Sequence, residues 1–442
     1  MLALGNHWTS ARSPMLSPGN RSHSRLRAAA GQYREARQSL RTPASVRSRH
    51  GLDWTNFFIA DVQTGFGTFV AFYLAHAGWS QSNVGLALAV GTIAGVLSQI
   101  PGGALADAVK WKRGLVAIGI AMVGTAALIL ALKPDFAWVF LAEVLQGSTG
   151  GIITPAIAAI SLGLVGRQAM SVRTGRNYRF SAGGNALTAG LMGAAGTYLS
   201  DGAIFFAAAA LCVPALIALG TIRGEEIDYA KARNAVAGKK QVSSARVLDL
   251  VKNRRLVLFA GALMLFQLAN ASMLPLIGEH LARSDANGTP LWMSGLIVAP
   301  QIVVAFLAPW IGFHGEKRGR RPLLLIGFAM QPIRAAILAV TAYYPFLVAA
   351  QVLDGISGAT VGVLTVIVLT DLTAGTGRFN LAIGAIGALN GIAAAISTST
   401  TGFLFQHFGA HIGFVPLAVV GAAATALVWV FLAETKPEKY ED

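Results

Sequence analysis

The chain has 442 residues, of which 54% are hydrophobic and only 12% are charged, and its mean hydropathy is +0.57. A chain with so few charged residues cannot cover the surface of a soluble globular protein. The composition therefore indicates a polytopic membrane protein. The net charge of +15 does not indicate a nucleic-acid partner, because the basic residues are divided among loops and a tail. The single cysteine, Cys212, excludes an intrachain disulfide.

Residues 1–52 contain no apolar run, and we expect them to form a disordered, basic cytoplasmic tail. The first 50 residues hold nine arginines and one acidic residue, Glu35. This composition also resembles an organellar transit sequence. A third interpretation is a start site assigned too early, with Leu40 or Val46 as the alternative start.

Twelve apolar stretches follow, each long enough to cross a bilayer as a helix. They lie at about 57–76, 83–106, 114–132, 137–162, 180–199, 203–222, 256–277, 291–312, 323–342, 346–370, 380–405 and 411–433. We therefore predict an all-α integral membrane protein with twelve transmembrane helices in two six-helix halves. The predicted divisions are a half at 53–222, a cytoplasmic linker at 223–255, a half at 256–434 and a short cytoplasmic tail at 435–442.

The distribution of basic residues predicts the orientation of the chain. With both termini inside, only Lys133 and Arg283 of the 35 Lys and Arg residues lie in outward connections, and Arg334 lies within a span. Because cytoplasmic loops retain Lys and Arg, we expect cytoplasmic termini and a multi-pass location in a bacterial inner membrane.

A short charged connector occurs twice, at equivalent positions of the two halves. The first copy runs from Gly103 to Arg113 and the second from Gly312 to Arg321. Both resemble the G-x-L-A-D-R-x-G-R-K loop that follows the second helix of each half in major facilitator superfamily transporters. The first copy keeps Gly103, Leu105, Asp107 and Lys112 of this pattern and ends at Arg113. The second keeps Gly312, Gly319 and Arg320, has Glu316 and Lys317 as same-charge replacements, and ends at Arg321.

The fourth and tenth stretches also match each other. Glu143–Gly150 and Gln351–Gly358 carry polar and small residues at equivalent positions. The first segment resembles the superfamily's R-x-x-Q-G element, but Glu143 stands where that element has arginine. The resemblance implies that this arginine assists proton transfer in the superfamily's drug antiporters. An acid reverses the local charge, so that role is not assigned to Glu143, and the motifs do not establish export.

Four charged residues fall within apolar stretches, where each needs a partner or a cavity. They are Asp61, Glu143, Arg334 and Asp354. The resemblance implies that the first, fourth, seventh and tenth helices line a central cavity. We expect Asp61 and Glu143 to couple transport to protons and Gln146, Gln267, Asn270 and Asp354 to line the substrate cavity.

Arg334 and Asp354 are also expected to form an intramembrane ion pair. By helix rise, each lies about 12 to 13 Å from the outer face on neighbouring antiparallel spans. For the acids the structural alternative is a carboxylate satisfied by neighbouring polar groups, such as Thr64 for Asp61.

The function that the residues and the resemblance favour is secondary transport by alternating access, with proton-coupled efflux of a small organic compound. Proton-coupled uptake of a nutrient or metabolite is the first alternative, and a receptor or scaffold with a transporter fold is the second. The sequence contains no G-x-x-x-x-G-K-S/T loop and no metal-ligand or Ser-His-acid spacing, so we expect no cofactor, no metal and no enzymatic activity. The expected partners are a small-molecule substrate, protons and the lipid bilayer, and the expected state is a monomer.

Overall fold

A computed structural model of the chain describes residues 44–64, 70–71, 73–74, 77–132, 135–198, 201–235, 248–277, 289–341 and 343–437. Helices make up nearly all of these residues. Within these ranges, pairing between extended segments is limited to isolated bridges that join Ala235 to Gly375 and Thr376.

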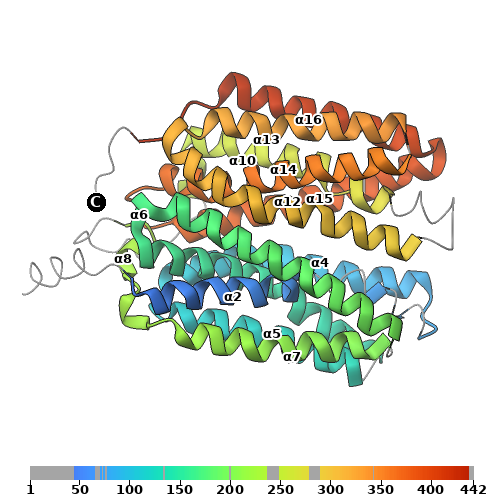
Figure 1. The fold of residues 1–442 in the computed structure, drawn as a ribbon, viewed down its shortest axis with the longest axis horizontal. Helices are drawn as coiled ribbons and strands as arrows, with labels where there is room; N and C mark the ends of the chain where they lie inside the picture. Colours follow the sequence, from blue (N-terminus) through green and yellow to red (C-terminus); the bar gives the residue numbers. More distant parts are fainter. Residues whose placement is uncertain are drawn as a thin grey trace, which may run out of the picture. The chain divides into compact units, whose positions relative to one another are not determined.

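The helices of the first half pack on one another, with α6 in contact with each of the others (Figure 1). They are α2 (Val46–Thr64), α4 (Gln81–Ala108), α5 (Lys112–Leu132), α6 (Phe136–Tyr198) and α7 (Asp201–Thr221). The segment that follows contains the short helices η1 (Gly224–Glu226), α8 (Tyr229–Ala232) and α9 (Leu248–Val251).

The second half repeats this organisation with a second set of long helices. They are α10 (Arg254–Asn270), α12 (Thr289–Arg318), α13 (Arg321–Val340), α14 (Tyr344–Leu372), α15 (Phe379–Phe408) and α16 (Ala410–Phe431). The two halves meet mainly where α4 packs on α15 and where α6 packs on α12.

Ten helical segments within the described ranges are long and apolar enough to cross a membrane. Many of their large apolar side chains point outward, including Phe306 at 76% and Val340 at 80% exposed. Apolar exposure on this scale suits helices that are solvated by lipid. The prediction of an all-α integral membrane protein is confirmed.

Two helix boundaries differ from the sequence-based expectation. The helix α2 begins at Val46, within the stretch that we expected to be a tail, because the Ser45 hydroxyl accepts the Ser48 amide and Glu226 binds the Ser45 amide at 2.9 Å. The expected connector between the fourth and fifth stretches is also helical. It is interrupted only at Gly166, whose φ of 69° breaks α6 into two arms.

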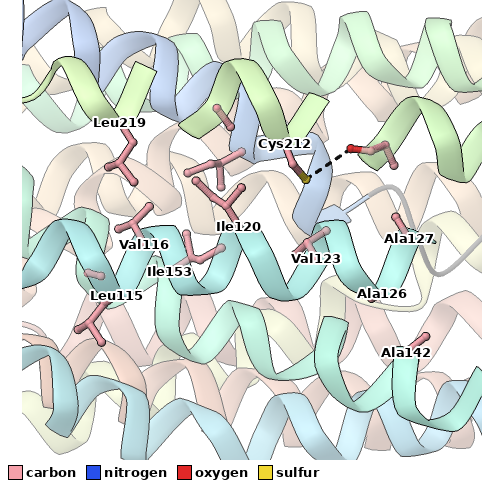
Figure 2. Close-up of a cluster of buried hydrophobic side chains, with 14 of the residues drawn as sticks. Leu115, Val116, Ile120, Val123, Ala126, Ala127, Ala142, Ile153, Cys212 and Leu219 are labelled. Atoms are coloured by element: carbon pink, nitrogen blue, oxygen red, sulfur yellow. Dashed lines mark hydrogen bonds between the residues drawn. The ribbon is translucent and has the colours of Figure 1, made fainter. Parts of the chain in front are cut away.

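Small residues let the helices of the first half approach closely. The buried face of α5 packs against α6 and α7, where Ile120, Ile153 and Leu219 belong to one apolar cluster (Figure 2). At the crossing of α4 and α6, a Cβ added to Gly147 would collide with the Gly91 carbonyl. The glycine content therefore serves close backbone contact between helices, as it commonly does in membrane proteins.

Candidate functional site

A carboxylate on α4 joins the two halves. Asp107 Oδ2 accepts the Leu381 amide at 2.8 Å, and Oδ1 accepts the Asn380 amide at 3.2 Å and the Asn380 side-chain amide at 2.8 Å. These donors belong to the first turn of α15, where a negative charge is stabilised by unpaired N–H groups and the helix dipole. We call the end of the helices that carries this contact the Asp107 end.

The segment 223–235, which we call the strap, crosses the Asp107 end and touches both halves. On the first half, the Asp228 amide donates to the Gly163 carbonyl at 3.1 Å and the Tyr229 hydroxyl donates to the Ala108 carbonyl at 2.8 Å. On the second half, Asn234 Nδ2 donates to the Thr370 carbonyl at 2.6 Å. The strap therefore reinforces the contact between the halves.

The two repeated loops share one contact and differ in another. Gly103 faces the Asn380 backbone of α15, and Gly312 faces the Ser171 backbone of α6, so each glycine allows close approach to the opposite half. The acids behave differently. Asp107 reaches across the halves, whereas Glu316 pairs with Arg320 at 3.1 Å within its own half.

The other residues of the repeated loops bind locally. Arg320 also pairs with Asp371 at 3.2 Å, and Gly319 has a φ of 96°. The remaining basic residues donate to backbone carbonyls: Lys112 to Ala106, Arg113 to Gly220 and Arg321 to Trp429.

A buried polar cluster lies between α10, α13 and α14. Arg334 Nη1 donates to Asp354 Oδ1 at 2.6 Å and to Asn270 Oδ1 at 2.7 Å, and Nη2 donates to Gln351 at 3.4 Å. The Arg334 side chain is 2% exposed and the Asp354 side chain is 24% exposed. The structure thus brings together three of the predicted residues, Asn270, Arg334 and Asp354.

Glu143 lies on α6, far along the helix from the Asp107 end, and is 4% exposed. Its carboxylate rests against Gly91 of α4, where a Cβ would overlap it. Among the residues that the structure describes, no basic side chain pairs with this carboxylate. A buried carboxylate without a cationic partner is stabilised in its protonated form.

A cavity of about 380 Å³ lies mainly between α2 and the two arms of α6, and Val366 of α14 and Ile383 of α15 complete its wall. Its polar lining consists of amides and hydroxyls: Asn56, Thr154, Thr174, Asn177, Tyr178, Ser181 and Asn185. In the described part of the chain, no Asp, Glu, Lys, Arg or His lines it. The buried Thr174 hydroxyl has no hydrogen-bond partner among the described residues, which leaves a polar group available to a ligand.

The family model for the Major Facilitator Superfamily matches residues 53–329 and 265–442. The chain belongs to the major facilitator superfamily. Two proteins named as uncharacterized MFS-type transporters, from the CDC 1551 / Oshkosh and ATCC 25618 / H37Rv strains of Mycobacterium tuberculosis, are each 36% identical over 395 residues. Each alignment covers 88% of this chain and 94% of the relative.

Two further similarities concern part of the sequence and the fold. The class D tetracycline resistance protein of Salmonella ordonez is 29% identical over 154 residues, which cover 35% of this chain and 38% of that protein. The crystal structure of the human organic anion transporter MFSD10 (TETRAN) superposes with a TM-score of 0.61 at 16% identity, covering 87% of this chain and 98% of that one. The latter similarity supports the superfamily fold.

The remaining predicted transport residues are dispersed. The Asp61 side chain, like that of Thr64, lies outside the residues whose side chains the structure describes. Gln146 and Gln267 are half-buried on α6 and α10. None of Gln146, Gln267, Asn270 and Asp354 lines the described cavity of about 380 Å³.

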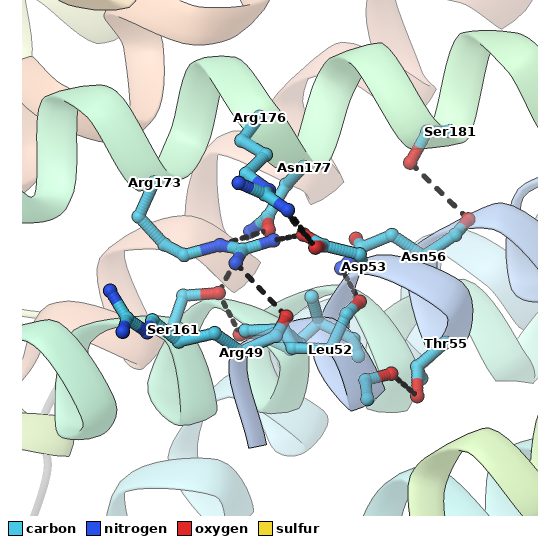
Figure 3. A network of polar contacts seen from close by, with 12 residues as sticks. Arg49, Leu52, Asp53, Thr55, Asn56, Ser161, Arg173, Arg176, Asn177 and Ser181 are labelled. Carbon is cyan, nitrogen blue, oxygen red and sulfur yellow. Dashed lines mark hydrogen bonds and ion pairs between the residues drawn. The ribbon is translucent and has the colours of Figure 1, made fainter. Parts of the chain in front are cut away.

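An ion-pair network that was not predicted from the sequence lies at the Asp107 end of the first half (Figure 3). Asp53 of α2 is 1% exposed and pairs with Arg173 at 2.5 Å and Arg176 at 2.6 Å, both on the second arm of α6. Arg173 also donates to Asn177, which donates to Ser161. The available signal for a helix here was twofold. Arg173, Arg176 and Asn177 are spaced at i, i+3 and i+4, and the segment from Gln168 to Ser181 contains no Gly or Pro except Gly175.

The described residues include no group of three or more His, Cys, Asp or Glu side chains that could hold a metal ion.

Proposed function

We propose that this superfamily member is a proton-coupled secondary transporter that exports a small organic compound by alternating access. In this proposal the halves at 53–222 and 256–434 are the two moving bodies. Glu143 and Asp61 carry the protons, and the cavity of about 380 Å³ holds part of the substrate. No enzymatic step is involved.

The burial of Glu143 is the observation that carries the proposal. A carboxylate with 4% exposure and no cationic partner among the described residues costs several kcal/mol when charged, so it takes up a proton in this state. If the halves move and water reaches Glu143 from the other side of the membrane, hydration stabilises the charged carboxylate and the proton leaves. Movement of the halves and release of the proton are then coupled.

The contacts between the halves support alternating access. Asp107 and the strap hold the halves together at the Asp107 end. Glu143 lies near the start of the first arm of α6, well before the break at Gly166, and so away from the Asp107 end. Because the contacts at the Asp107 end are hydrogen bonds and glycine crossings, which can separate without unfolding a helix, that end is suited to open and close.

The direction and the substrate class rest on the cavity and on one relative. The amide and hydroxyl lining favours an uncharged compound with several hydrogen-bonding groups, because no charged side chain in the described lining would neutralise an ion. The name of the Salmonella relative associates that protein with tetracycline resistance, which is consistent with export of a small organic compound.

The test uses the full chain in proteoliposomes with an imposed pH gradient. We expect the wild type to accumulate substrate against its gradient. We expect Glu143→Gln and Asp61→Asn to lose this accumulation while they retain binding or exchange, because the amides keep the size of the side chain and remove titration. Asp135→Asn, at an exposed acid outside the strap, is the control. If both amide variants still concentrate substrate with unchanged pH dependence, proton coupling by these acids is wrong, and accumulation in the opposite direction would support uptake instead.

For localisation we propose a monomer in the bacterial inner membrane with both termini in the cytoplasm. Reporter fusions after Lys239 test the orientation, since this position is in the predicted cytoplasmic linker. A fusion there that is active only in the periplasm would reverse the topology.

A further inference from the structure

A groove of about 650 Å³ lies on the surface of the protein at the Asp107 end, apart from the cavity described above. Trp54 and Phe57 of α2 and Arg176 and Arg179 of α6 form one wall. Ala305 and Pro309 of α12 form the other wall. The groove therefore spans the line where the two halves meet.

The apolar stretches of the sequence predict that the groove lies at the depth of a membrane interface. Trp54 lies just before the apolar stretch 57–76, Phe57 is the first residue of that stretch, and Arg179 immediately precedes the stretch 180–199. Pro309 is in the last turn of the stretch 291–312. Tryptophan and arginine at this level are typical of the headgroup region, where an aromatic ring meets the acyl chains and a cation meets phosphate.

The charges at the groove do not cancel. Asp53 is one carboxylate facing Arg173 and Arg176 (Figure 3), and Arg179 adds a third guanidinium. Arg176 donates hydrogen bonds from Nε and Nη2 to Asp53, and its side chain is still 46% exposed. Arg179 is exposed and forms no ion pair with any residue that the structure describes. The groove thus carries an excess of positive charge with a guanidinium available for a ligand.

We propose that this groove binds the phosphate of an anionic phospholipid in the leaflet at the Asp107 end. Arginine forms charge-assisted, often bidentate bonds with phosphate, and basic pockets between transmembrane helices are suited to anionic headgroups. The aromatic rings of Trp54 and Phe57 offer an apolar surface to the start of an acyl chain. A lipid seated here contacts α6 and α12 together and stabilises the arrangement in which the Asp107 end is closed. The proposal does not depend on proton coupling or on the direction of transport.

The test measures lipid binding to the purified full chain in neutral detergent micelles. Phosphatidylglycerol and phosphatidylcholine with identical acyl chains are titrated separately, and bound lipid is counted by native mass spectrometry. We expect phosphatidylglycerol to bind more tightly and to raise the melting temperature further than phosphatidylcholine does. We expect Arg179→Gln to weaken phosphatidylglycerol binding about tenfold, as loss of a charge-assisted bond implies.

Two variants serve as controls. Arg179→Lys keeps the charge and should retain most of the affinity. Arg255→Gln removes an exposed arginine at the same end but outside the groove, and it should leave binding unchanged. Since the Arg179 side chain is exposed, Arg179→Gln should melt at the wild-type temperature when only phosphatidylcholine is present.

Three results would overturn the proposal. The first is equal affinity for the two lipids. The second is an unchanged phosphatidylglycerol affinity in Arg179→Gln. The third is an equal rise in melting temperature with inorganic phosphate alone, which would show that the groove binds a free anion without requiring a lipid.

Discussion

At the scale of single residues, the cluster around Arg334 shows how a charge is accommodated within a span. Arg334 is 2% exposed and meets one carboxylate and two neutral amide oxygens. The carboxylate compensates the charge, and the amide oxygens of Asn270 and Gln351 occupy further N–H donors. Each of these partners replaces hydration that burial removes from the guanidinium, although the buried Arg334 Nε has no hydrogen-bond partner among the described residues.

This arrangement predicts a strong coupling between Arg334 and Asp354. Arg334→Met or Asp354→Leu should each destabilise the protein by about 3–5 kcal/mol, because each leaves the other charge uncompensated. The double variant should be milder than the sum of the single variants. Unfolding free energies of the four proteins in one detergent measure the coupling. Additive effects would show that the two charges do not stabilise each other.

At the scale of elements, the start of α13 is held by an acid from beyond the end of α16. Glu434 accepts the amides of Arg320 at 2.9 Å and Arg321 at 3.1 Å, and also those of Thr435 and Lys436. Burial by itself would raise the pKa of Glu434, but these backbone hydrogen bonds outweigh it and lower the pKa below its ordinary value of 4.5. The carboxylate thus acts as a helix cap supplied from another element.

The lowered pKa of Glu434 predicts a pH-dependent contribution to stability. A carboxylate with a lowered folded-state pKa stabilises fully above its ordinary pKa and loses this effect as the pH falls through the lowered value. Glu434→Gln should therefore be less stable than the wild type at pH 7, by about 0.5 kcal/mol for an exposed group. The difference should shrink as the pH falls below 4.5. Melting temperatures from pH 7 to pH 3 test this, and a constant difference would exclude a charged cap.

At the scale of the whole molecule, the two halves are joined asymmetrically. Asp107 and the strap link them at one end, and Asp107 provides a negative charge to the first turn of α15. The equivalent acid, Glu316, is held by Arg320 in its own half. Asp107 therefore contributes to the closed Asp107 end through hydrogen bonds that cross between the halves.

We predict that Asp107→Asn shifts the protein toward states that are open at the Asp107 end. Removing the charge at a helix N-terminus costs about 1–2 kcal/mol, which corresponds to a five- to thirtyfold change in the equilibrium. Spin labels at the exposed positions Lys110 and Arg254, one on each half, report the separation. Asp135→Asn, the same substitution at an exposed acid just before α6, is the matched control and should leave the distances unchanged. Identical distance distributions in Asp107→Asn and the wild type would contradict the prediction.

The sequence by itself determined the class of the protein and its internal repeat. Apolar stretches of about 20 residues permit only helices within a bilayer, because every backbone polar group must be satisfied inside its own segment. The apolar pattern also made its exceptions visible in the sequence. These are the charged connectors that begin at Gly103 and Gly312, and the charged residues within the spans. These are local properties, and the loops were enough to predict the superfamily.

Only the tertiary structure decided which polar groups meet. Asp107 and its partner Leu381 are separated by 274 positions, and Ser45 and Glu226 by 181, so no local pattern connects them. Equal depth on neighbouring spans predicted Arg334 beside Asp354, but depth alone could not reveal that Gln351 joins them. Asp107 and Glu316 occupy equivalent positions in the two repeated loops. Their roles differ because a carboxylate binds whichever donors the packing of distant helices brings within reach: for Glu316 this is Arg320, and for Asp107 it is the first turn of α15.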